Sequence, residues 1–125
     1  MRPDRVLIVD DDSSTRLGLV QLLVQAGYDA TAVGTFDEAR RIISATPPDL
    51  LITDIRLEAY NGLQLILNSP RTIPTIVITG FADPVLEAEA RRGGAEYMVK
   101  PVQPRQLLEA VAEKLAARHS HPGIQ

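Results

Sequence analysis

Short apolar runs alternate along this chain with segments of helical periodicity, and this alternation limits what the chain can fold into. Four of the runs are rich in Val and Ile, and at least three are too continuous for the strands of a half-exposed antiparallel sheet. A fifth run is weaker and more polar, as an edge strand would be. The expected strands are Val6–Val9, Asp29–Val33, Leu50–Thr53, Thr75–Thr79 and Ala95–Val99.

Helix signals lie between these strands. Thr35-Phe-Asp-Glu38 is a capping box, which opens a helix that turns Ala39, Ile42 and Ile43 inward. Asp83-Pro84 places an N-cap before a proline at the first helical position, and Gly93-Gly94 ends that helix. The last helix opens at Gln103-Pro104, and its apolar positions are Leu107, Leu108, Val111 and Leu115.

Two further helices are expected on weaker grounds. Ser14–Ala26 is ended by Gly27, and the shortest helix is Leu63–Asn68. The inward stripe of the first is expected to be Leu17, Val20 and Val24, with Leu19 and Leu23 beside it. Strand and helix thus alternate five times, which indicates a parallel α/β sheet with helices on both faces.

Length and composition agree with a single cytoplasmic domain. The chain has 125 residues, no cysteine and a net charge of −3, so a thiol site is excluded and the basic footprint of a nucleic-acid binder is missing. No apolar run approaches the roughly 20 residues needed to span a bilayer. We expect the domain to occupy residues 1–118 and residues 119–125, which include His119 and His121, to be a flexible tail or the start of a linker.

Polar residues with complementary chemistry follow the expected strands. In an open parallel sheet, ligands bind beyond the carboxyl ends of the strands. The residues at those ends are Asp10-Asp11-Asp12, Asp54, Thr79-Gly80 and Lys100-Pro101.

These strand ends form a plausible phosphoryl-transfer site. Carboxylates held close together do not all ionise cheaply unless a cation binds among them, and an all-oxygen ligand set favours Mg²⁺ or Mn²⁺. A carboxylate beside such an ion can attack phosphorus and form an aspartyl-phosphate. Lys100 and Thr79 would then supply donors to the phosphoryl oxygens, with Gly80 leaving room beside the hydroxyl.

Four motifs in order resemble the receiver domain of two-component response regulators. They are VLIVDDD at the first strand, LLITDIRL around Asp54, IVITG around Thr79 and YMVKP around Lys100, and they span residues 5 to about 117. The resemblance implies a flavodoxin-like doubly wound (βα)5 fold with a five-stranded parallel sheet in the order 2-1-3-4-5.

The same resemblance implies a role for each site residue. Asp54 is the expected phospho-acceptor, and Asp10 and Asp11 are the acidic pair that binds Mg²⁺, with Asp11 the more direct ligand. Thr79 and Tyr97 are the expected switch pair, although Tyr97 also fits plain core. The remaining roles are a metal-binding backbone carbonyl at Arg56, the lysine Lys100 and a cis-proline at Pro101. Asp12 falls outside this set and is expected to cap the first helix.

One position departs from the family pattern, and two others are positions that commonly affect the lifetime of the phosphorylated state. Glu58 adds a carboxylate where the family often has a rigid Pro-Gly loop, and we expect it to face solvent. Arg56 and Phe81 occupy the two positions that commonly set the lifetime of the phosphorylated state, and both are large. We therefore expect slow self-dephosphorylation, measurable as a faster decay in Phe81→Ala.

The resemblance implies a signalling role rather than that of a metabolic enzyme, although the domain would catalyse its own phosphorylation and dephosphorylation. The expected partners are a sensor histidine kinase or phosphotransfer protein, an output domain on the same chain or in trans, and a second copy that pairs through the fourth helix, fifth strand and fifth helix. No direct nucleic-acid or membrane contact is expected.

Two alternatives stay open. Asp10-x-Asp12-x-Ser14 loosely resembles the opening of haloacid-dehalogenase phosphohydrolases, in which Asp10 would be the nucleophile. The other alternative is a receiver-like interaction module that is not phosphorylated.

Overall fold

Five parallel strands form one sheet in the order β2-β1-β3-β4-β5. The computed structural model describes residues 2–54, 73–80 and 82–119. The strands are β1 (Arg5–Val9), β2 (Asp29–Val33), β3 (Leu50–Thr53), β4 (Thr75–Thr79) and β5 (Glu96–Val99). The predicted fold class and strand order are therefore confirmed.

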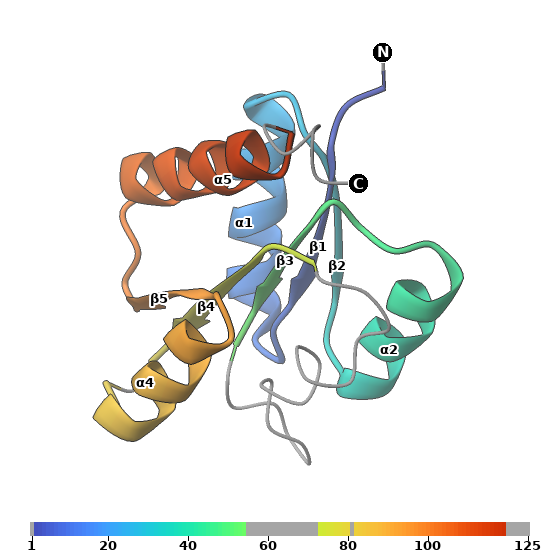
Figure 1. The fold of residues 1–125 in the computed structure, drawn as a ribbon. Helices are drawn as coiled ribbons and strands as arrows, with labels where there is room; N and C mark the ends of the chain where they lie inside the picture. Colours follow the sequence, from blue (N-terminus) through green and yellow to red (C-terminus); the bar gives the residue numbers. More distant parts are fainter. Residues whose placement is uncertain (1, 55–72, 81, 120–125) are drawn as a thin grey trace.

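The described helices cover both faces of the sheet (Figure 1). They are α1 (Ser13–Gln25), α2 (Phe36–Ala45), α4 (Pro84–Arg92) and α5 (Pro104–His119). Helices α1 and α5 pack on one face, whereas α2 and α4 pack on the other. The short helix expected at Leu63–Asn68 lies outside the described residues.

Alternation along each strand explains the two-sided core. In β1, Val6 and Ile8 face α1 and α5, while Leu7 and Val9 face α2. All four side chains are almost wholly buried, which is why the strand reads as one continuous apolar run.

The helix boundaries follow the expected signals. Thr35 caps α2 by accepting a hydrogen bond from the Glu38 amide, and Asp83 caps α4 by accepting from two amides of its first turn. Gly27 follows α1 with φ +99°, a left-handed conformation that glycine adopts without a steric penalty.

The predicted inward stripe of α1 is wrong. Leu17 and Val24 are 61% and 53% exposed, while Leu19 and Leu23 are buried and Val20 is partly buried. Because α1 carries apolar residues around most of its circumference, its periodicity alone does not identify the buried side. The position of the sheet and α5 decides it instead.

A charged cluster closes the end of the sheet where the strands begin. The carboxylate of Asp49 accepts the Arg5 amide at 2.7 Å and pairs with Arg118 of α5 at 3.1 Å and with Arg2 at 3.5 Å. This group, called the Asp49 cluster below, ties the last turn of α5 to the first residues of β1 and β3. It lies at the opposite end of the sheet from the strand ends that carry the candidate site.

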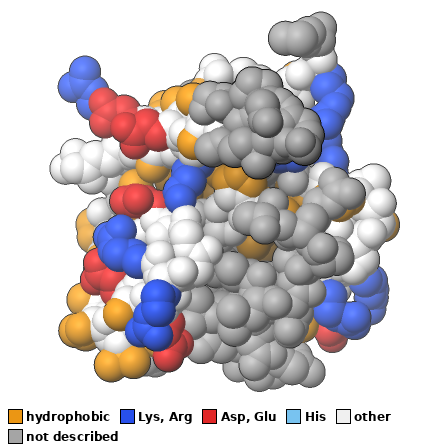
Figure 2. Space-filling model, in the orientation of Figure 1, with side chains coloured by type: hydrophobic (Ala, Val, Ile, Leu, Met, Phe, Trp, Pro, Cys, Tyr) orange, Lys and Arg blue, Asp and Glu red, His pale blue; other side chains and the backbone are white. Residues whose placement is uncertain are grey.

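The molecular surface is mixed in charge over much of α4 and α5. Figure 2 shows acidic and basic side chains beside one another on this side of the molecule. Among the described residues, no helix is long and apolar enough to cross a bilayer.

Candidate functional site

Backbone pairing brings the carboxyl ends of the strands to one edge. The Asp54 amide donates to the Val9 carbonyl at 2.9 Å, which places the end of β3 beside the end of β1. The Lys100 amide donates to the Thr79 carbonyl at 2.7 Å, which does the same for β5 and β4. The predicted polar residues therefore meet at this edge, called the acidic edge below.

Three carboxylates gather at the acidic edge. Asp10 is fully buried, Asp54 is 6% exposed and Asp11 is exposed. One oxygen from each lies within 4.8 Å of the other two. The group contains only carboxylate donors, with neither histidine nor cysteine, and so fits a hard cation such as Mg²⁺ or Mn²⁺.

Lys100 lies between two of these carboxylates. Its Nζ is 2.8 Å from Oδ2 of Asp10 and 3.2 Å from Oδ2 of Asp54. Burial alone would lower the pKa of Lys100, but its hydrogen bonds and charge interactions with Asp10 and Asp54 outweigh burial and raise that pKa above its ordinary value. The lysine therefore stays charged and offsets the like charges around it.

Asp12 has the separate role that the sequence predicts. Its side chain caps α1 by accepting hydrogen bonds from the Thr15 hydroxyl at 2.6 Å and the Thr15 amide at 2.9 Å. These two bonds hold the pKa of the Asp12 carboxyl below its usual value. The Asp12 amide in turn donates to Oδ1 of Asp10, so the cap and the acidic pair form one turn.

The two residues predicted as a switch pair lie on neighbouring strands. Thr79 is fully buried at the end of β4, and Tyr97 is 5% exposed on β5. Tyr97 belongs to a small core cluster with Val77 and Ala90, and therefore connects β4, β5 and α4. The Lys100-Pro101 peptide bond is cis, as expected.

The expected roles of four further residues are not tested by the described contacts. A Cβ built on Gly80 would meet no residue other than its immediate chain neighbours within 4 Å, and the predicted room beside the Thr79 hydroxyl stays a prediction. Arg56, Glu58 and Phe81 lie outside the described residues, and their expected roles stay predictions.

Arg16 of α1 belongs to the acidic edge but was not singled out by sequence reasoning. Its guanidinium donates to the Asp10 carbonyl at 2.7 Å and lies close against Gly34, where an added Cβ would be 2.9 Å from the same nitrogen. The available signal was a cation on the helix that directly follows an acidic strand end. Its contact with the β2–α2 connection depends on how α1 lies over the sheet.

An apolar groove leads away from this edge. A cavity of about 590 Å³ lies between α1 and the connection from β5 to α5, and its lining includes Gly18, Leu22 and Pro101. Lys100 also lines it, so the groove adjoins the acidic edge.

A doubly wound five-stranded sheet with three aspartates and a lysine at its carboxyl edge defines a flavodoxin-like domain of the receiver class. The chain belongs to the response regulator receiver domain family of two-component systems, whose family description matches residues 6–112.

Similar solved structures agree in fold over nearly the whole chain. A CheY-like response regulator receiver domain protein from Methanospirillum hungatei JF-1 is 31% identical with a TM-score of 0.88, covering 94% of this chain and 97% of the other. The signal receiver domain of a putative Luxo repressor protein from Vibrio parahaemolyticus is 28% identical with a TM-score of 0.87, covering 95% and 94%.

Curated relatives are longer proteins. The DNA-binding response regulator MtrA of Mycobacterium tuberculosis is 29% identical over 94% of this chain and 53% of the relative. The C4-dicarboxylate transport transcriptional regulatory protein DctD of Pseudomonas aeruginosa is 35% identical over 91% of this chain and 26% of the relative. The chain thus spans about half or less of the curated relatives it matches.

Proposed function

We propose that this domain accepts a phosphoryl group on Asp54 from a phosphohistidine of a partner kinase or phosphotransfer protein, in a Mg²⁺-dependent reaction. The observation that supports this role is the position of Asp54, whose carboxylate lies 3.2 Å from Lys100 and within 4.8 Å of the oxygens of Asp10 and Asp11. The role is signalling, and the domain would catalyse both the transfer and the later hydrolysis.

Each group has a chemical part in the transfer. An Asp54 oxygen attacks phosphorus, so that an O–P bond forms while the P–N bond of the donor breaks and its electron pair returns to the imidazole nitrogen. When bound by Asp10, Asp11 and Asp54, Mg²⁺ would supply positive charge to the phosphoryl oxygens. Lys100 would donate to a phosphoryl oxygen after leaving Asp54, and the Thr79 hydroxyl would donate to another. Water later attacks phosphorus, the bond between phosphorus and the Asp54 oxygen breaks, and inorganic phosphate leaves while the Asp54 carboxylate is restored.

The contacts of Asp10 restrict its side chain as a nucleophile. Its side chain is fully buried, Oδ1 accepts the Asp12 amide and Oδ2 accepts Lys100. Both oxygens are therefore fixed by hydrogen bonds, which suits a group that stabilises nearby positive charge. This arrangement argues against the Asp10 nucleophile of the phosphohydrolase alternative.

The proposed switch couples Asp54 to β5 and α4. A phosphoryl group on Asp54 would draw the Thr79 hydroxyl toward it and change the packing of Tyr97, which contacts the α4 cluster. Thr79→Ala is expected to accept phosphate while the NMR signals of Tyr97 and Ala90 stay at their unphosphorylated positions. The same shifts in Thr79→Ala as in the wild type would contradict this coupling.

The groove beside α1 is the proposed route for the phosphodonor protein. It is mostly apolar and reaches Lys100, so a helix of the donor can bind there with its histidine near Asp54. A Cβ on Gly18 meets nothing within 4 Å, so Gly18→Phe should fold normally and fill the groove. It is expected to slow transfer from a phosphorylated histidine kinase at least tenfold and to leave labelling by acetyl phosphate unchanged.

Acetyl phosphate labelling tests the central proposal. Wild-type protein with Mg²⁺ should gain the mass of one phosphoryl group, and Asp54→Asn or EDTA should abolish it. Intact mass spectrometry followed by peptide mapping gives the modified residue. Labelling that survives Asp54→Asn but not Asp10→Asn would favour the phosphohydrolase, and no labelling of the wild type would favour the unphosphorylated interaction module.

A further inference from the structure

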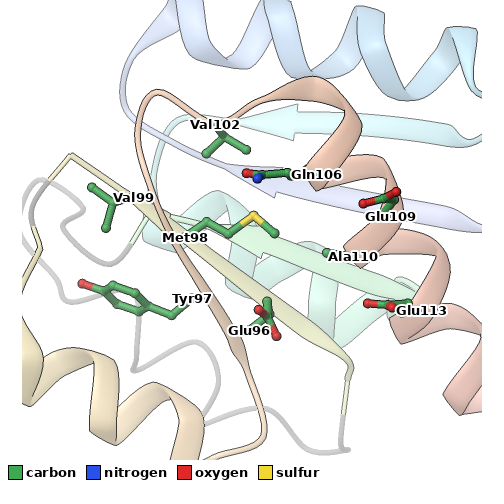
Figure 3. Close-up of a pocket in the computed structure, with 9 residues that line it drawn as sticks. All are labelled: Glu96, Tyr97, Met98, Val99, Val102, Gln106, Glu109, Ala110 and Glu113. Atoms are coloured by element: carbon green, nitrogen blue, oxygen red, sulfur yellow. The ribbon is translucent and has the colours of Figure 1, made fainter.

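A shallow groove runs between β5 and α5 on the side of the sheet away from β2 (Figure 3). Its volume is about 420 Å³. Its apolar floor is formed by Met98 of β5, Val102 of the connection between β5 and α5, and Ala110 of α5. Met98 and Val102 are only partly buried, so apolar surface remains open at an edge strand that has no further strand beside it among the described residues.

Three glutamates surround this floor. Figure 3 shows Glu96 of β5 on one side and Glu109 and Glu113 of α5 on the other, whereas the ring of Tyr97 points away toward α4. Glu109 and Glu113 are four residues apart and therefore lie on the same side of α5.

The charge of these glutamates is poorly neutralised. Within the described ranges, no cation lies within ion-pair distance of Glu109 or Glu113. Arg91 lies 3.9 Å from Glu96 but makes its short contact, 2.9 Å, with Glu87. Lys114 is the nearest lysine in sequence, and its Nζ donates to the Gly94 carbonyl at 2.6 Å. Like charges one helical turn apart destabilise an isolated helix, so a basic partner would relieve repulsion that the free domain retains.

We propose that this groove binds a basic amphipathic helix of the output partner. The apolar side of that helix would cover Met98 and Val102. Lysine or arginine side chains one turn apart would pair with Glu109 and Glu113, because the same four-residue spacing recurs on both helices. This inference rests on the proposed function in taking the groove as the output contact of a receiver domain.

A second copy of the chain is a poorer occupant. In a twofold symmetric pair centred on the groove the same patch meets itself, so the three glutamates of one copy would lie near the three glutamates of the other. Repulsion between close, partly desolvated like charges would lower the affinity of the two copies for each other. A homodimer centred on this groove is therefore disfavoured, whereas the wider face that includes α4 also carries Arg91 and Arg92, and pairing through it stays a prediction.

The test uses two synthetic helical peptides as probes, one of leucine and lysine and one of leucine and glutamate in the same pattern. The lysine peptide should bind the wild type and shift the Met98 methyl signal in NMR spectra, and the glutamate peptide should not bind. In Glu109→Lys/Glu113→Lys, affinity for the lysine peptide should fall at least tenfold. Raising the salt concentration should weaken wild-type binding.

A control variant distinguishes the effect of charge in the groove from the effect of the protein's net charge. Glu89→Lys/Asp37→Lys changes the net charge equally at two exposed positions outside the groove and should keep most of the affinity. Equal losses in both double variants, or an unshifted Met98 methyl, would overturn the proposal. So would a wild-type dimer in analytical ultracentrifugation, with or without acetyl phosphate, that Glu109→Lys/Glu113→Lys dissociates.

The same samples distinguish this inference from the proposed function. All variants should still be labelled by acetyl phosphate on Asp54, because the substitutions lie outside the acidic edge. Absent labelling of the wild type would refute the proposed function, whereas normal labelling with equal peptide binding by both double variants would refute only the groove.

Discussion

At the scale of single residues, the charge balance of the acidic edge depends on Lys100. Its Nζ contacts both Asp10 and Asp54, which are nearly inaccessible to water. Removing one partner of a buried charge pair leaves the other uncompensated, which typically costs about 3–5 kcal/mol. A divalent cation among the same carboxylates can replace part of the missing positive charge.

Lys100→Met should therefore lose about 3 kcal/mol of unfolding free energy without Mg²⁺ and recover part of it with Mg²⁺. Urea denaturation in EDTA and in millimolar Mg²⁺ measures both values. Lys114→Met is the matched control, because its contact with the Gly94 carbonyl is remote from the acidic edge. An equal loss with and without Mg²⁺ would show that Lys100 does not balance this site.

The pH dependence of the same residue has a definite sign. Because the pKa of Lys100 is raised on folding, its contribution is complete below the ordinary lysine value of 10.5 and is lost as pH rises through the higher folded pKa. The stability difference between wild type and Lys100→Met should stay constant from neutral pH to about pH 10 and shrink above 10.5. Urea titrations across this range measure it, and a difference that grows above pH 10.5 would contradict the raised pKa.

Arg16 and Gly34 give a third prediction at this scale. A methyl group on Gly34 would meet the Arg16 guanidinium at 2.9 Å and displace it from the Asp10 carbonyl. Gly34→Ala and Arg16→Met should each weaken Mg²⁺ binding by about tenfold, as loss of a supporting contact behind a metal ligand usually does. Isothermal titration calorimetry measures the affinity.

The double variant tests whether Gly34 acts through Arg16. If it does, Gly34→Ala/Arg16→Met should bind Mg²⁺ no more weakly than Arg16→Met alone. Gly18→Ala is the control, since an added Cβ there meets nothing within 4 Å. Additive losses would mean that the two residues support the site independently.

At the scale of elements, β1, β3 and β4 could be predicted because their residues are buried on both faces, whereas the edge strands β2 and β5 are only partly buried. The bounds of β2, β3 and β4 agree with the sequence pattern, and those of β1 and β5 differ by one residue at the start. The acidic edge could be predicted for a related reason, since parallel strands bring their carboxyl ends to the same edge. The position of Arg16 at this edge could not be predicted, because its contact depends on how α1 lies over the β2–α2 connection.

Helix α1 shows where periodicity alone fails. Leucine and valine surround most of it, so the residues that reach the core are chosen by contact with β1, β3 and α5. Arg16 is its one charged residue, and its other polar residues are spread along the helix, so polarity does not mark the solvent side. By contrast, α2 alternates charged residues with Ala39 and Ile43, and both of these are buried as predicted.

The corrected buried side of α1 leads to a stability prediction. Leu23→Ala should cost about 2–5 kcal/mol, because Leu23 is fully buried and its loss would leave a cavity. Leu17→Ala, on the exposed side of the same helix, should change stability by less than about 0.5 kcal/mol. Urea denaturation of the two variants is the measurement. Similar losses of stability would mean that Leu17 is also buried, as the sequence pattern predicts.

At the scale of the whole molecule, the two ends of the sheet have different charge arrangements. The acidic edge holds like charges near one lysine, whereas the Asp49 carboxylate lies among the guanidinium groups of Arg2 and Arg118 and the backbone amide of Arg5. Asp49 is also largely buried and accepts a backbone amide. The Asp49 cluster therefore contributes to stability without taking part in the proposed chemistry.

Asp49→Ala should lower the free energy of unfolding by about 2–3 kcal/mol, because it removes hydrogen bonds from charged donors and leaves the Arg5 amide without its acceptor. Mg²⁺ affinity and acetyl phosphate labelling should be unchanged at temperatures well below unfolding. Asp37→Ala is the control, as its exposed pair with Arg40 is 3.9 Å long and worth little. A loss of labelling in folded Asp49→Ala would contradict this separation.

The Asp49 cluster also has a practical consequence for attaching the protein to a surface or a fluorophore. It fixes the last described turn of α5 beside the start of β1, about one strand length, or ~17 Å, from the acidic edge. A fluorophore or surface tether joined near Arg118 would thus be held away from Asp54. Immobilised in that way, the domain would keep its reactive edge facing the solution, which suits a biosensor that reports phosphoryl transfer.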